Sequence, residues 1–527
     1  MLIDGKEAAD FVIDKLRFHN QFALGPYFLE KMVSWNCTAI DGTIFLSSHP
    51  DLNVIQTTLN DKSLTLIGFI LDPYNPSAND ADIVNGLIRD YSDFDHFIDL
   101  TKRFGGRWII IAENSQGIKL FTDPAGLRQI FYTDTRKTGE LWCASQPGMI
   151  ADILNLRMCK EGIDYINTYE FRKNQEFWWP GVTTPYEEVM HLLPNHFLDL
   201  TNGSCKRYWP SQSLENTPLT SSIDKCSSLL QGLLKSASHR FELAFAITAG
   251  LDSRVVLAAS KDLNNVFSYM TVRQIGMAEN HADIEIPSRL LSKIGLSHDV
   301  VRSSLIIDDG FFDIFRNNTA LAHPIYASDA YAILKYYAGK SVKQIVVVTG
   351  SASEIARSSF RAQLNKPVCE AITPSDLASL HSMGKSSYVL KAFERWISGI
   401  ENIHGYDILD IFEWEQGHGN WLAMCQLEFD IAWKDLFTPF NCRELLETML
   451  SVDYKYRKAP DYALFHAIIS NLWPELLDIP INPHKNNDSA SRENMTGIGK
   501  LRDFIPASVK KPLKYIYSIF VKRLIVY

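Results

Sequence analysis

No apolar stretch in this 527-residue sequence reaches the roughly 18 residues that a membrane-spanning helix needs. Its eight cysteines are scattered without a Cys-x-x-Cys pair, which argues against a disulfide framework or cysteine-bound zinc and favours reduced thiols. The first residues, Met-Leu-Ile-Asp-Gly-Lys-Glu, lack a basic segment followed by a long apolar run, so we expect no secretory signal. The net charge of −9 argues against a nucleic-acid-binding surface. These absences predict a cytoplasmic protein without a nucleic-acid partner.

The composition is that of a folded protein with more than one domain. Hydrophobic residues make up 46% of the chain and charged residues 21%, as in soluble globular proteins. A chain of 527 residues is too long for one ordinary core, so we expect two or three domains.

A strand, a tight turn and the start of a helix follow one another between Glu242 and Leu257. Residues 243–247 form an apolar run, Thr248-Ala249-Gly250 is small and turn-permissive, and helical spacing begins at Asp252. Such a turn binds phosphate, because unpaired N–H groups and the helix dipole point at the anion. The turn is not a Walker A loop, since no Gly-Lys-Ser/Thr follows at the required distance.

Each residue of this loop has an expected role. Asp252 is a candidate ligand for the Mg²⁺ that accompanies a triphosphate, and the hydroxyl group of Ser253 can donate to the phosphates. The candidate phosphate-binding residues are Thr248, Ala249, Gly250, Leu251 and Ser253.

The segment Thr-Ala-Gly-Leu-Asp-Ser resembles the Ser-Gly-Gly-x-Asp-Ser pyrophosphate loop of the asparagine synthetase family. Members of that family use ATP to adenylate a carboxylate, release pyrophosphate and let an amine attack. The resemblance therefore implies ATP and Mg²⁺ as cofactors. The alternative is an ordinary strand–turn–helix connection in an α/β domain.

The first two hundred residues are rich in short apolar runs separated by turn signals. Several segments resemble, in the same order, the glutaminase-type domain of the family. These segments are Phe104 to Ile111, Leu120 to Tyr132, Tyr165 to Gly181, His191 to His196, and Arg207 to Trp209. The resemblance implies an αββα sandwich that closes near Trp209-Pro210.

The reaction of a glutaminase is expected to be absent. The family requires a cysteine as the new N-terminal residue, whereas position 2 is Leu2 and the nearest cysteine is Cys37. No counterpart of the glutamine-holding loops is present, and Gly68-Phe69-Ile70-Leu71-Asp72 stands where the second would fall. Free ammonia or an amine of the substrate would then be the nucleophile.

After the phosphate loop, strands and helices alternate, which predicts a doubly wound parallel sheet. Expected strands are 266–272, 298–302 and 344–348, with helices at 223–237, 282–294 and 328–337. Nucleotides bind at the carboxyl ends of such strands. Thr271 and Val272 are therefore expected to present backbone to adenine. Residues 211–222, rich in Ser, Thr and Pro, are the expected linker before this domain.

A second element for the phosphates is expected after the strand at 344–348. Thr349-Gly350-Ser351-Ala352-Ser353-Glu354 resembles the family's Ser-Gly-Glu/Asp-Gly-x-Asp, which places Gly350 at the nucleotide and Glu354 at the second Mg²⁺ carboxylate. The alternative is that Glu354 is a surface residue that caps the next helix. Arg357 and Arg361 lie one helical turn apart and could face the phosphates or solvent.

Asp283 and His298 match the spacing of a further family segment, but a core or strand-end histidine is the preferred interpretation of His298. The chain to about residue 480 is expected to be helical. The polar, glycine-interrupted stretch 413–421 is a candidate lining of the acceptor pocket. A catalytic lysine of the family aligns with Asn482, and Lys485 is the candidate substitute, with a solvated surface lysine as the alternative.

The chain therefore divides into three expected segments. Residues 1–212 form the glutaminase-like domain, residues 213–500 the asparagine synthetase-like ATP-pyrophosphatase (PP-loop) domain with a helical C-terminal part, and residues 501–527 a basic amphipathic tail. The tail fits peripheral membrane contact, docking on its own domain, or a partner. A homodimer also stays open.

The predicted function is an ATP-dependent carbon–nitrogen ligase. It would adenylate a small-molecule carboxylate for attack by ammonia or a substrate amine, with Asp252, Glu354 and Lys485 as catalytic residues. The opposing interpretation is a nucleotide-binding or membrane-associated relative without catalysis, which Asn482 and Glu354 favour.

Overall fold

The computed structural model describes residues 15–340 and 345–483. The described residues up to Ile481 belong to one compact unit, which contains two antiparallel sheets followed by a parallel sheet. The tail at 501–527 lies outside the described residues, and the expected domain boundary near residue 212 stays a prediction.

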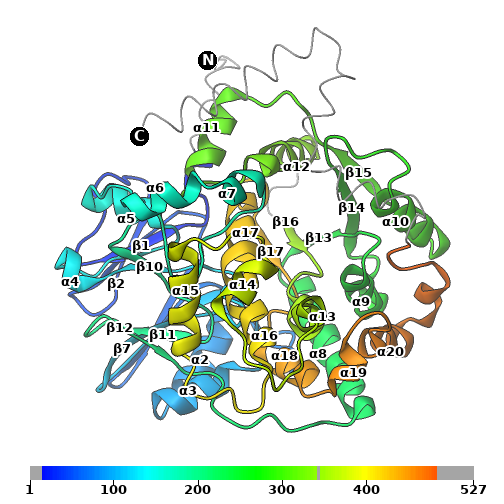
Figure 1. Ribbon diagram of the computed structural model, residues 1–527, viewed down its shortest axis with the longest axis horizontal. Coiled ribbons are helices and arrows are strands. Elements are labelled where there is room, and N and C mark those ends of the chain that lie inside the picture. Colours follow the sequence, from blue (N-terminus) through cyan, green and yellow to red (C-terminus); the bar gives the residue numbers. More distant parts are fainter. Residues whose placement is uncertain (1–14, 341–344, 484–527) are drawn as a thin grey trace. The chain divides into compact units, whose positions relative to one another are not determined.

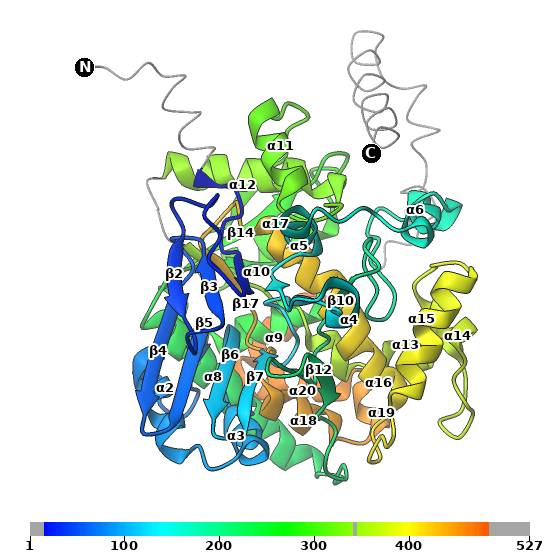
Figure 2. The same cartoon turned by 90° about the vertical axis from the view of Figure 1, so that its left-hand side faces the viewer.

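The two antiparallel sheets each contain six strands (Figure 2). The first has the order β10 (Val189–His191), β8 (Phe131–Thr133), β9 (Cys143–Ala144), β1 (Phe22–Gly25), β3 (Phe45–Ser48), β2 (Asn36–Ala39). The second has the order β12 (Ser204–Arg207), β11 (His196–Asp199), β7 (Gly117–Thr122), β6 (Gly105–Asn114), β5 (Lys62–Leu71), β4 (Val54–Leu59).

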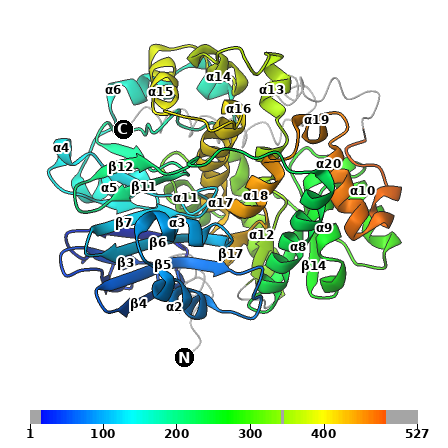
Figure 3. The ribbon, with the colours of Figure 1, turned by 90° about the horizontal axis from the view of Figure 1, so that it is seen from below.

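Alternation along β6 shows how these sheets are layered. Ile109 and Ile111 pack in the core between the two sheets, whereas Trp108 and Ile110 pack under the helices α2 (Asp80–Asp90) and α3 (Phe94–Thr101). Side chains point alternately to the two faces of a strand, so β6 is buried on both sides. Figure 3 shows α2 and α3 beside β4, β5 and β6.

A helix covers the outer face of the first sheet as well. Met149 and Ile150 of α5 (Pro147–Leu154) pack with Ala23 of β1 and Trp142. The layers are therefore helix, sheet, sheet, helix, as the family resemblance implies. Shorter helices follow, namely α4 (Thr135–Thr138), α6 (Lys160–Ile166) and α7 (Tyr169–Lys173).

The parallel sheet has five strands in the order β15 (Asp299–Arg302), β14 (Phe267–Arg273), β13 (Glu242–Ala246), β16 (Ile345–Val348), β17 (Asp435–Phe437). All four neighbouring pairs are parallel. The first four strands and their order along the chain match the prediction. The fifth strand, β17, corrects it, since this region was expected to be entirely helical.

Helices cover both faces of this sheet, which makes it doubly wound (Figure 1). Leu243 and Phe245 of β13 face α8 (Leu219–Ser238), α9 (Leu251–Ala259) and α10 (Ala282–Lys293). Ala244 faces α11 (Asp309–Asn317) and α12 (Ala327–Gly339). Helix α8 begins at Leu219, so the expected linker at 211–222 ends earlier than predicted.

The chain after β16 is mostly helical, as expected. Its helices are a 3-10 turn (Ser353–Ala356), α13 (Ser359–Leu364), α14 (Pro374–Leu380), α15 (Ser387–Ser398), α16 (Ile408–Phe412), a π-helix (Glu413–Leu422), α17 (Ala423–Phe429), α18 (Arg443–Leu450), α19 (Tyr454–Arg457) and α20 (Ala463–Leu472). Further 3-10 turns span Lys261–Leu263, Pro324–Tyr326 and Pro474–Asp478.

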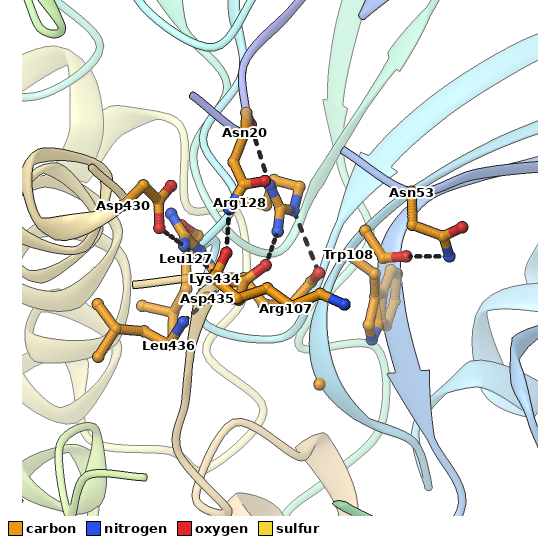
Figure 4. A network of polar contacts seen from close by, with 12 residues as sticks. Asn20, Asn53, Arg107, Trp108, Leu127, Arg128, Asp430, Lys434, Asp435 and Leu436 are labelled. Atoms are coloured by element: carbon orange, nitrogen blue, oxygen red, sulfur yellow. Dashed lines mark hydrogen bonds and ion pairs between the residues drawn. The ribbon is translucent and has the colours of Figure 1, made fainter. Parts of the chain in front are cut away.

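A buried polar network joins the antiparallel sheets to the parallel one (Figure 4). Arg107 of β6 donates to Asp430 at 2.5 Å and to Asp435 at 2.9 Å, and Arg128 donates to Asp435 at 2.6 Å. The side chains of Arg107 and Asp430 are 2% and 0% exposed. Because Asp435 begins β17, these ion pairs fix the edge of the parallel sheet to the sandwich.

Candidate functional site

The two predicted phosphate elements lie at the carboxyl ends of the neighbouring strands β13 and β16. The chain leaves β13 toward β14 on one side, whereas β16 lies on the other side, so the strand order reverses between them. Ligands of open α/β sheets bind at such a reversal.

Gly350 lets the two elements touch. A Cβ atom at Gly350 would lie 2.6 Å from the carbonyl carbon of Asp252 and 2.7 Å from the nitrogen of Ser253. Distances below 3.0 Å exclude a side chain unless the backbone moves. Gly350 therefore allows close approach to the first loop. The nucleotide contact that the sequence predicts for Gly350 stays a prediction.

The first loop, residues 248–253, is held by its own hydroxyl groups. Ser253 Oγ lies 3.3 Å from the nitrogen of Thr248 and 3.1 Å from the oxygen of the same residue. Thr248 Oγ1 accepts from the nitrogen of Gly250 at 3.2 Å. Helix α9 then starts at Leu251, and its N-cap residue, Gly250, has no side chain that could cap the first turn. An uncapped helix N-terminus retains the N–H groups that an anion would accept from.

A carboxylate already holds one backbone group of this loop. Asp283 Oδ1 accepts from the nitrogen of Ala249 at 3.0 Å, which ties the loop to the first turn of α10. Ala249 itself is 2% exposed, so its side chain is part of the core. The backbone N–H of Ala249 is therefore engaged by protein and does not point to a ligand in this structure.

The second loop, residues 349–354, has a residue with a left-handed backbone two positions before Glu354. Ala352 has a φ angle of 72°, in the left-handed region that glycine prefers, and it stands where the related motif has its second glycine. Ser353 Oγ donates to Asp252 Oδ1. The loop thereby presents Ser353 and Glu354 toward Asp252.

Arg357 bridges the two predicted metal-binding carboxylates. Its Nη2 atom lies 2.7 Å from Asp252 Oδ2 and 2.8 Å from Glu354 Oε1. The side chains of Asp252 and Glu354 are 18% and 36% exposed, so the cluster is open to solvent on the Glu354 side. The sequence left open whether Arg357 faces the phosphates or solvent, and the structure places it between the two carboxylates.

The two carboxyl groups have different environments. Burial and the negative charge of Glu354 raise the pKa of Asp252 above its usual range. Burial acts in the same direction on Glu354, but the hydrogen bond to His418 and the charge of Arg357 outweigh it and lower the pKa of Glu354. Opposite shifts in neighbouring groups are typical of functional sites and of structural ion-pair networks alike.

His418 reaches Glu354 from the π-helix Glu413–Leu422. His418 Nε2 lies 3.4 Å from Glu354 Oε2, and its Nδ1 lies 2.9 Å from the carbonyl oxygen of Glu413. Since a carbonyl and a carboxylate only accept, both ring nitrogens carry protons in this arrangement. Burial opposes that charge, but the hydrogen bond to Glu354 and the charge of Glu413 raise the pKa of His418.

The π-helix accounts for the polar stretch that the sequence assigned to the acceptor pocket. A helix of i→i+5 hydrogen bonds is rare and frequently lies at functional sites. Most of its residues are buried, and burial raises the pKa of Glu413 to about 7. The stretch contacts Glu354 through His418. Its role as the lining of an acceptor pocket stays a prediction.

Three further residues singled out in the sequence, Thr271, His298 and Arg361, contact protein groups in the structure. Thr271, on β14 beside Val272, donates from Oγ1 to the oxygen of Ile247 at 2.6 Å, and its Oγ1 lies 2.8 Å from His298 Nε2. His298 lies directly before β15 and contacts Thr271 within β14, so it is a strand-end histidine, as preferred from the sequence. Arg361 forms an ion pair with Asp407 and does not join the two carboxylates.

Lys485 lies outside the described residues, and its catalytic role stays a prediction. Asn482 has a left-handed backbone with a φ angle of 44°. Position 2 also lies outside the described residues. Gly68-Phe69-Ile70-Leu71-Asp72, where the family has a glutamine-holding loop, instead ends strand β5, and Asp80 accepts from the nitrogen of Ile70 at 2.8 Å.

The donor set suits a hard divalent cation. Asp252 and Glu354 offer carboxylate oxygens, which Mg²⁺ prefers, and Mg²⁺ commonly takes one or two carboxylates, several waters and the phosphates of a substrate. Arg357 now bonds both carboxylates, so binding of Mg²⁺ requires it to turn toward the phosphates or toward solvent. The residues therefore fit Mg²⁺ in chemistry.

No helix in the described ranges is long and apolar enough to span a membrane. No protein-family model and no curated protein matches the chain. Among solved structures, it is similar to "glutamine phosphoribosylpyrophosphate (PRPP) amidotransferase from B. subtilis complexed with ADP and GMP", at 10% identity and a TM-score of 0.24 over 65% of this chain and 78% of that one. It is also similar to the "structure of the allosteric regulatory enzyme of purine biosynthesis", at 10% identity and a TM-score of 0.24 over 75% of this chain and 90% of that one. Neither likeness, at such a TM-score, supports a conclusion about fold or activity.

Proposed function

We propose that the protein is an asparagine synthetase-like, ATP-dependent amide-forming ligase. It would adenylate a small-molecule carboxylate, release pyrophosphate, and let ammonia or a substrate amine attack the acyl adenylate. One observation supports this most directly. Two loops at the carboxyl ends of β13 and β16 bring Asp252 and Glu354 onto the same guanidinium group, beside the uncapped start of α9.

The chain's own residues have definite parts in this proposal. The first turn of α9 would hold the pyrophosphate through backbone N–H groups, with Ser253 fixing the loop. Asp252 and Glu354 would hold Mg²⁺, which offsets the charge that develops on the departing pyrophosphate. His418 keeps Glu354 ionised through its hydrogen bond. Thr271 and Val272 would present backbone to adenine.

The sandwich is proposed to have no glutaminase reaction. Its strand β5 runs through the segment where the family would hold glutamine. Ammonia should therefore support the reaction and glutamine should not. A test with each donor separates these outcomes.

The experiment that tests the function measures Mg²⁺-dependent pyrophosphate release from ATP against a panel of carboxylates with ammonia. Release that requires one acceptor, and that falls at least about 100-fold in Asp252→Asn, would support the ligase. Asp299→Asn is the matched control, because Asp299 lies on the edge strand β15 and pairs with Lys340. Retention of full activity in Asp252→Asn would contradict the proposal.

A nucleotide-binding relative without catalysis is the second candidate. Two observations favour it, namely that Arg357 bonds both carboxylates and that Asp283 takes the N–H of Ala249. Exchange of labelled pyrophosphate into ATP separates the candidates, since only an adenylating enzyme returns the label. Binding of ATP without exchange would support the second candidate. Peripheral membrane contact through 501–527 and a homodimer remain proposals for either candidate.

A further inference from the structure

Two histidines and an aspartate converge at the open end of strands β1 and β3. His19 precedes β1, and His49 and Asp51 follow β3, so the antiparallel pairing of Phe22 with Ser48 brings them together. One ligand atom from each of the three side chains lies within 4.8 Å of the others. This cluster, His19–His49–Asp51, has no part in the function proposed above.

Backbone carbonyl groups fix which nitrogen of each ring carries a proton. His19 Nδ1 lies 2.6 Å from the carbonyl oxygen of Asp430, and His49 Nε2 lies 3.1 Å from that of Lys15. A carbonyl group only accepts, so both nitrogens must donate. The opposite nitrogens, His19 Nε2 and His49 Nδ1, are then left to face Asp51.

These opposite nitrogens point at the same carboxylate. His19 Nε2 lies 3.4 Å from Asp51 Oδ2, and His49 Nδ1 lies 4.0 Å from the same oxygen. The backbone nitrogen of Asp51 donates to His49 Nδ1 at 3.2 Å, which marks Nδ1 as the acceptor nitrogen. Histidine ligands of metals almost always donate their other ring nitrogen to a carbonyl or carboxylate in this way.

Burial and access also suit a metal ion. The side chains of His19 and His49 are 10% and 7% exposed, whereas that of Asp51 is 65% exposed. The imidazole rings are therefore held rigidly, and the carboxylate side opens to solvent. Zinc sites of this composition keep a further position for water.

An ordinary ion pair is the competing explanation. A proton on His19 Nε2 would pair with Asp51 and satisfy the 3.4 Å contact. It accounts for His19 alone, whereas His49 Nδ1 accepts from the backbone of Asp51 and lies 4.0 Å from the same carboxylate oxygen.

We propose that His19, His49 and Asp51 form a Zn²⁺ site that the function of the parallel sheet does not require. Zinc bonds of about 2.0–2.1 Å to nitrogen and oxygen place tetrahedral ligands about 3.3 Å apart. The 3.4 Å pair already has this spacing, and the ligand atoms of all three side chains lie within 4.8 Å of one another, so metal binding requires only a small inward movement of the other pairs. The ion joins the start of β1, the end of β3 and, through His19, the chain at Asp430.

A second cluster of metal-binding residue types has a different character. His323, Cys425 and Glu428 also lie within 4.8 Å of one another, but both ring nitrogens of His323 face acceptors, Glu428 at 3.0 Å and the oxygen of Phe177 at 2.6 Å. All three residues of this cluster are buried, so it lacks the solvent-open side that Asp51 gives the first cluster. This cluster serves as the internal control.

Zinc binding to the full chain tests the proposal. The chelator-treated protein is dialysed against Zn²⁺ alone at pH 7.5, and bound metal and the thermal midpoint are measured. We expect one tightly bound Zn²⁺ per chain, at least about tenfold weaker binding in Asp51→Asn and in His49→Gln, and a Zn²⁺-dependent rise in midpoint that these variants lose. Asp51→Asn changes an exposed side chain, so its midpoint without metal reports whether it folds.

Two control variants complete the test. His96→Gln removes an exposed histidine on α3, and Cys425→Ser removes the thiol of the second cluster; both should bind as the wild type does. Unchanged binding in Asp51→Asn, loss of binding in Cys425→Ser, or no stoichiometric binding by the wild type would each overturn the proposal. None of these readouts depends on ligase activity, so the two proposals can fail separately.

Discussion

Arg357 places its Nη2 atom 2.7 Å from Oδ2 of Asp252, although the two residues lie 105 positions apart in the chain. The same nitrogen bonds Glu354, so one guanidinium group pairs with both predicted metal ligands. A divalent cation and Arg357 therefore compete for the same oxygens.

Replacing Arg357 should make stability depend on Mg²⁺. Arg357→Met leaves Asp252 and Glu354 facing each other, and the partial exposure of both limits the cost to about 1–3 kcal/mol without metal. Mg²⁺ should recover much of this loss. Thermal unfolding with and without Mg²⁺ checks it.

Arg361→Met is the matched control for Arg357→Met. Arg361 pairs with Asp407, so its loss should lower stability without a response to Mg²⁺. An equal Mg²⁺ response in both variants would show that the cation does not bind at Asp252 and Glu354.

Gly350→Ala should separate the two loops. The new Cβ would lie 2.6 Å from the Asp252 backbone, and relieving such overpacking costs about 1–3 kcal/mol and moves Asp252 relative to Glu354. Pyrophosphate release should fall together with the thermal midpoint. In Gly339→Ala, at the end of α12, the added Cβ meets nothing within 4 Å, so neither quantity should fall.

The π-helix should give the protein a measurable pH dependence. Burial raises the pKa of Glu413 from 4.5 to about 7, so the folded state holds a proton that the unfolded chain has released. This stabilisation is present below pH 4.5 and is lost as pH rises through 7, and the raised pKa of His418 acts in the same direction.

In Glu413→Gln, the fall in the free energy of unfolding with rising pH should be smaller than in the wild type by up to about 3 kcal/mol. Urea unfolding at pH 5 and pH 8 gives the change in free energy of unfolding for the variant and the wild type. Glu279→Gln alters a side chain that is 75% exposed and should leave the pH dependence unchanged. A wild-type slope in Glu413→Gln would mean that Glu413 is ionised at neutral pH.

The buried network between the sheets should dominate single-site stability. Arg107→Met leaves Asp430 and Asp435 without one of their cations in the interior, which costs about 3–5 kcal/mol. Arg136→Met removes a side chain that is 85% exposed and should change stability by less than about 0.5 kcal/mol. Chemical denaturation of the two variants checks this difference, and a small effect of Arg107→Met would mean that water relaxes the site.

The parallel sheet could be predicted from the sequence because its strands and helices are each marked by residues that are adjacent in the chain. The apolar run of β13, the small turn and the helical spacing of α9 occupy one continuous stretch. The motifs at Asp252 and Glu354 each follow a strand, and parallel strands end at one edge of a sheet, so their meeting followed from topology.

What the sequence did not predict depends on distant or backbone contacts. Strand β17 has three residues, and buried ion pairs to the sandwich hold Asp435 at its start, so no periodicity marks it. The π-helix is defined by hydrogen bonds that apolar spacing does not record. Gly417 and Gly419 were the only feature of this stretch that stood out in the sequence. They did not predict that His418, which lies between them, contacts Glu354.

The ion pairs of Arg107 and Arg128 make the parallel-sheet half of the chain depend on the antiparallel half. Both arginines belong to the sandwich, whereas Asp435 begins the edge strand β17 of the parallel sheet and Asp430 lies shortly before it. A shortened gene that began after the sandwich would encode those carboxylates without the guanidinium groups that face them. Loss of the sandwich would then leave buried carboxylates unpaired and destabilise the parallel-sheet half, whether or not the sandwich catalyses any reaction.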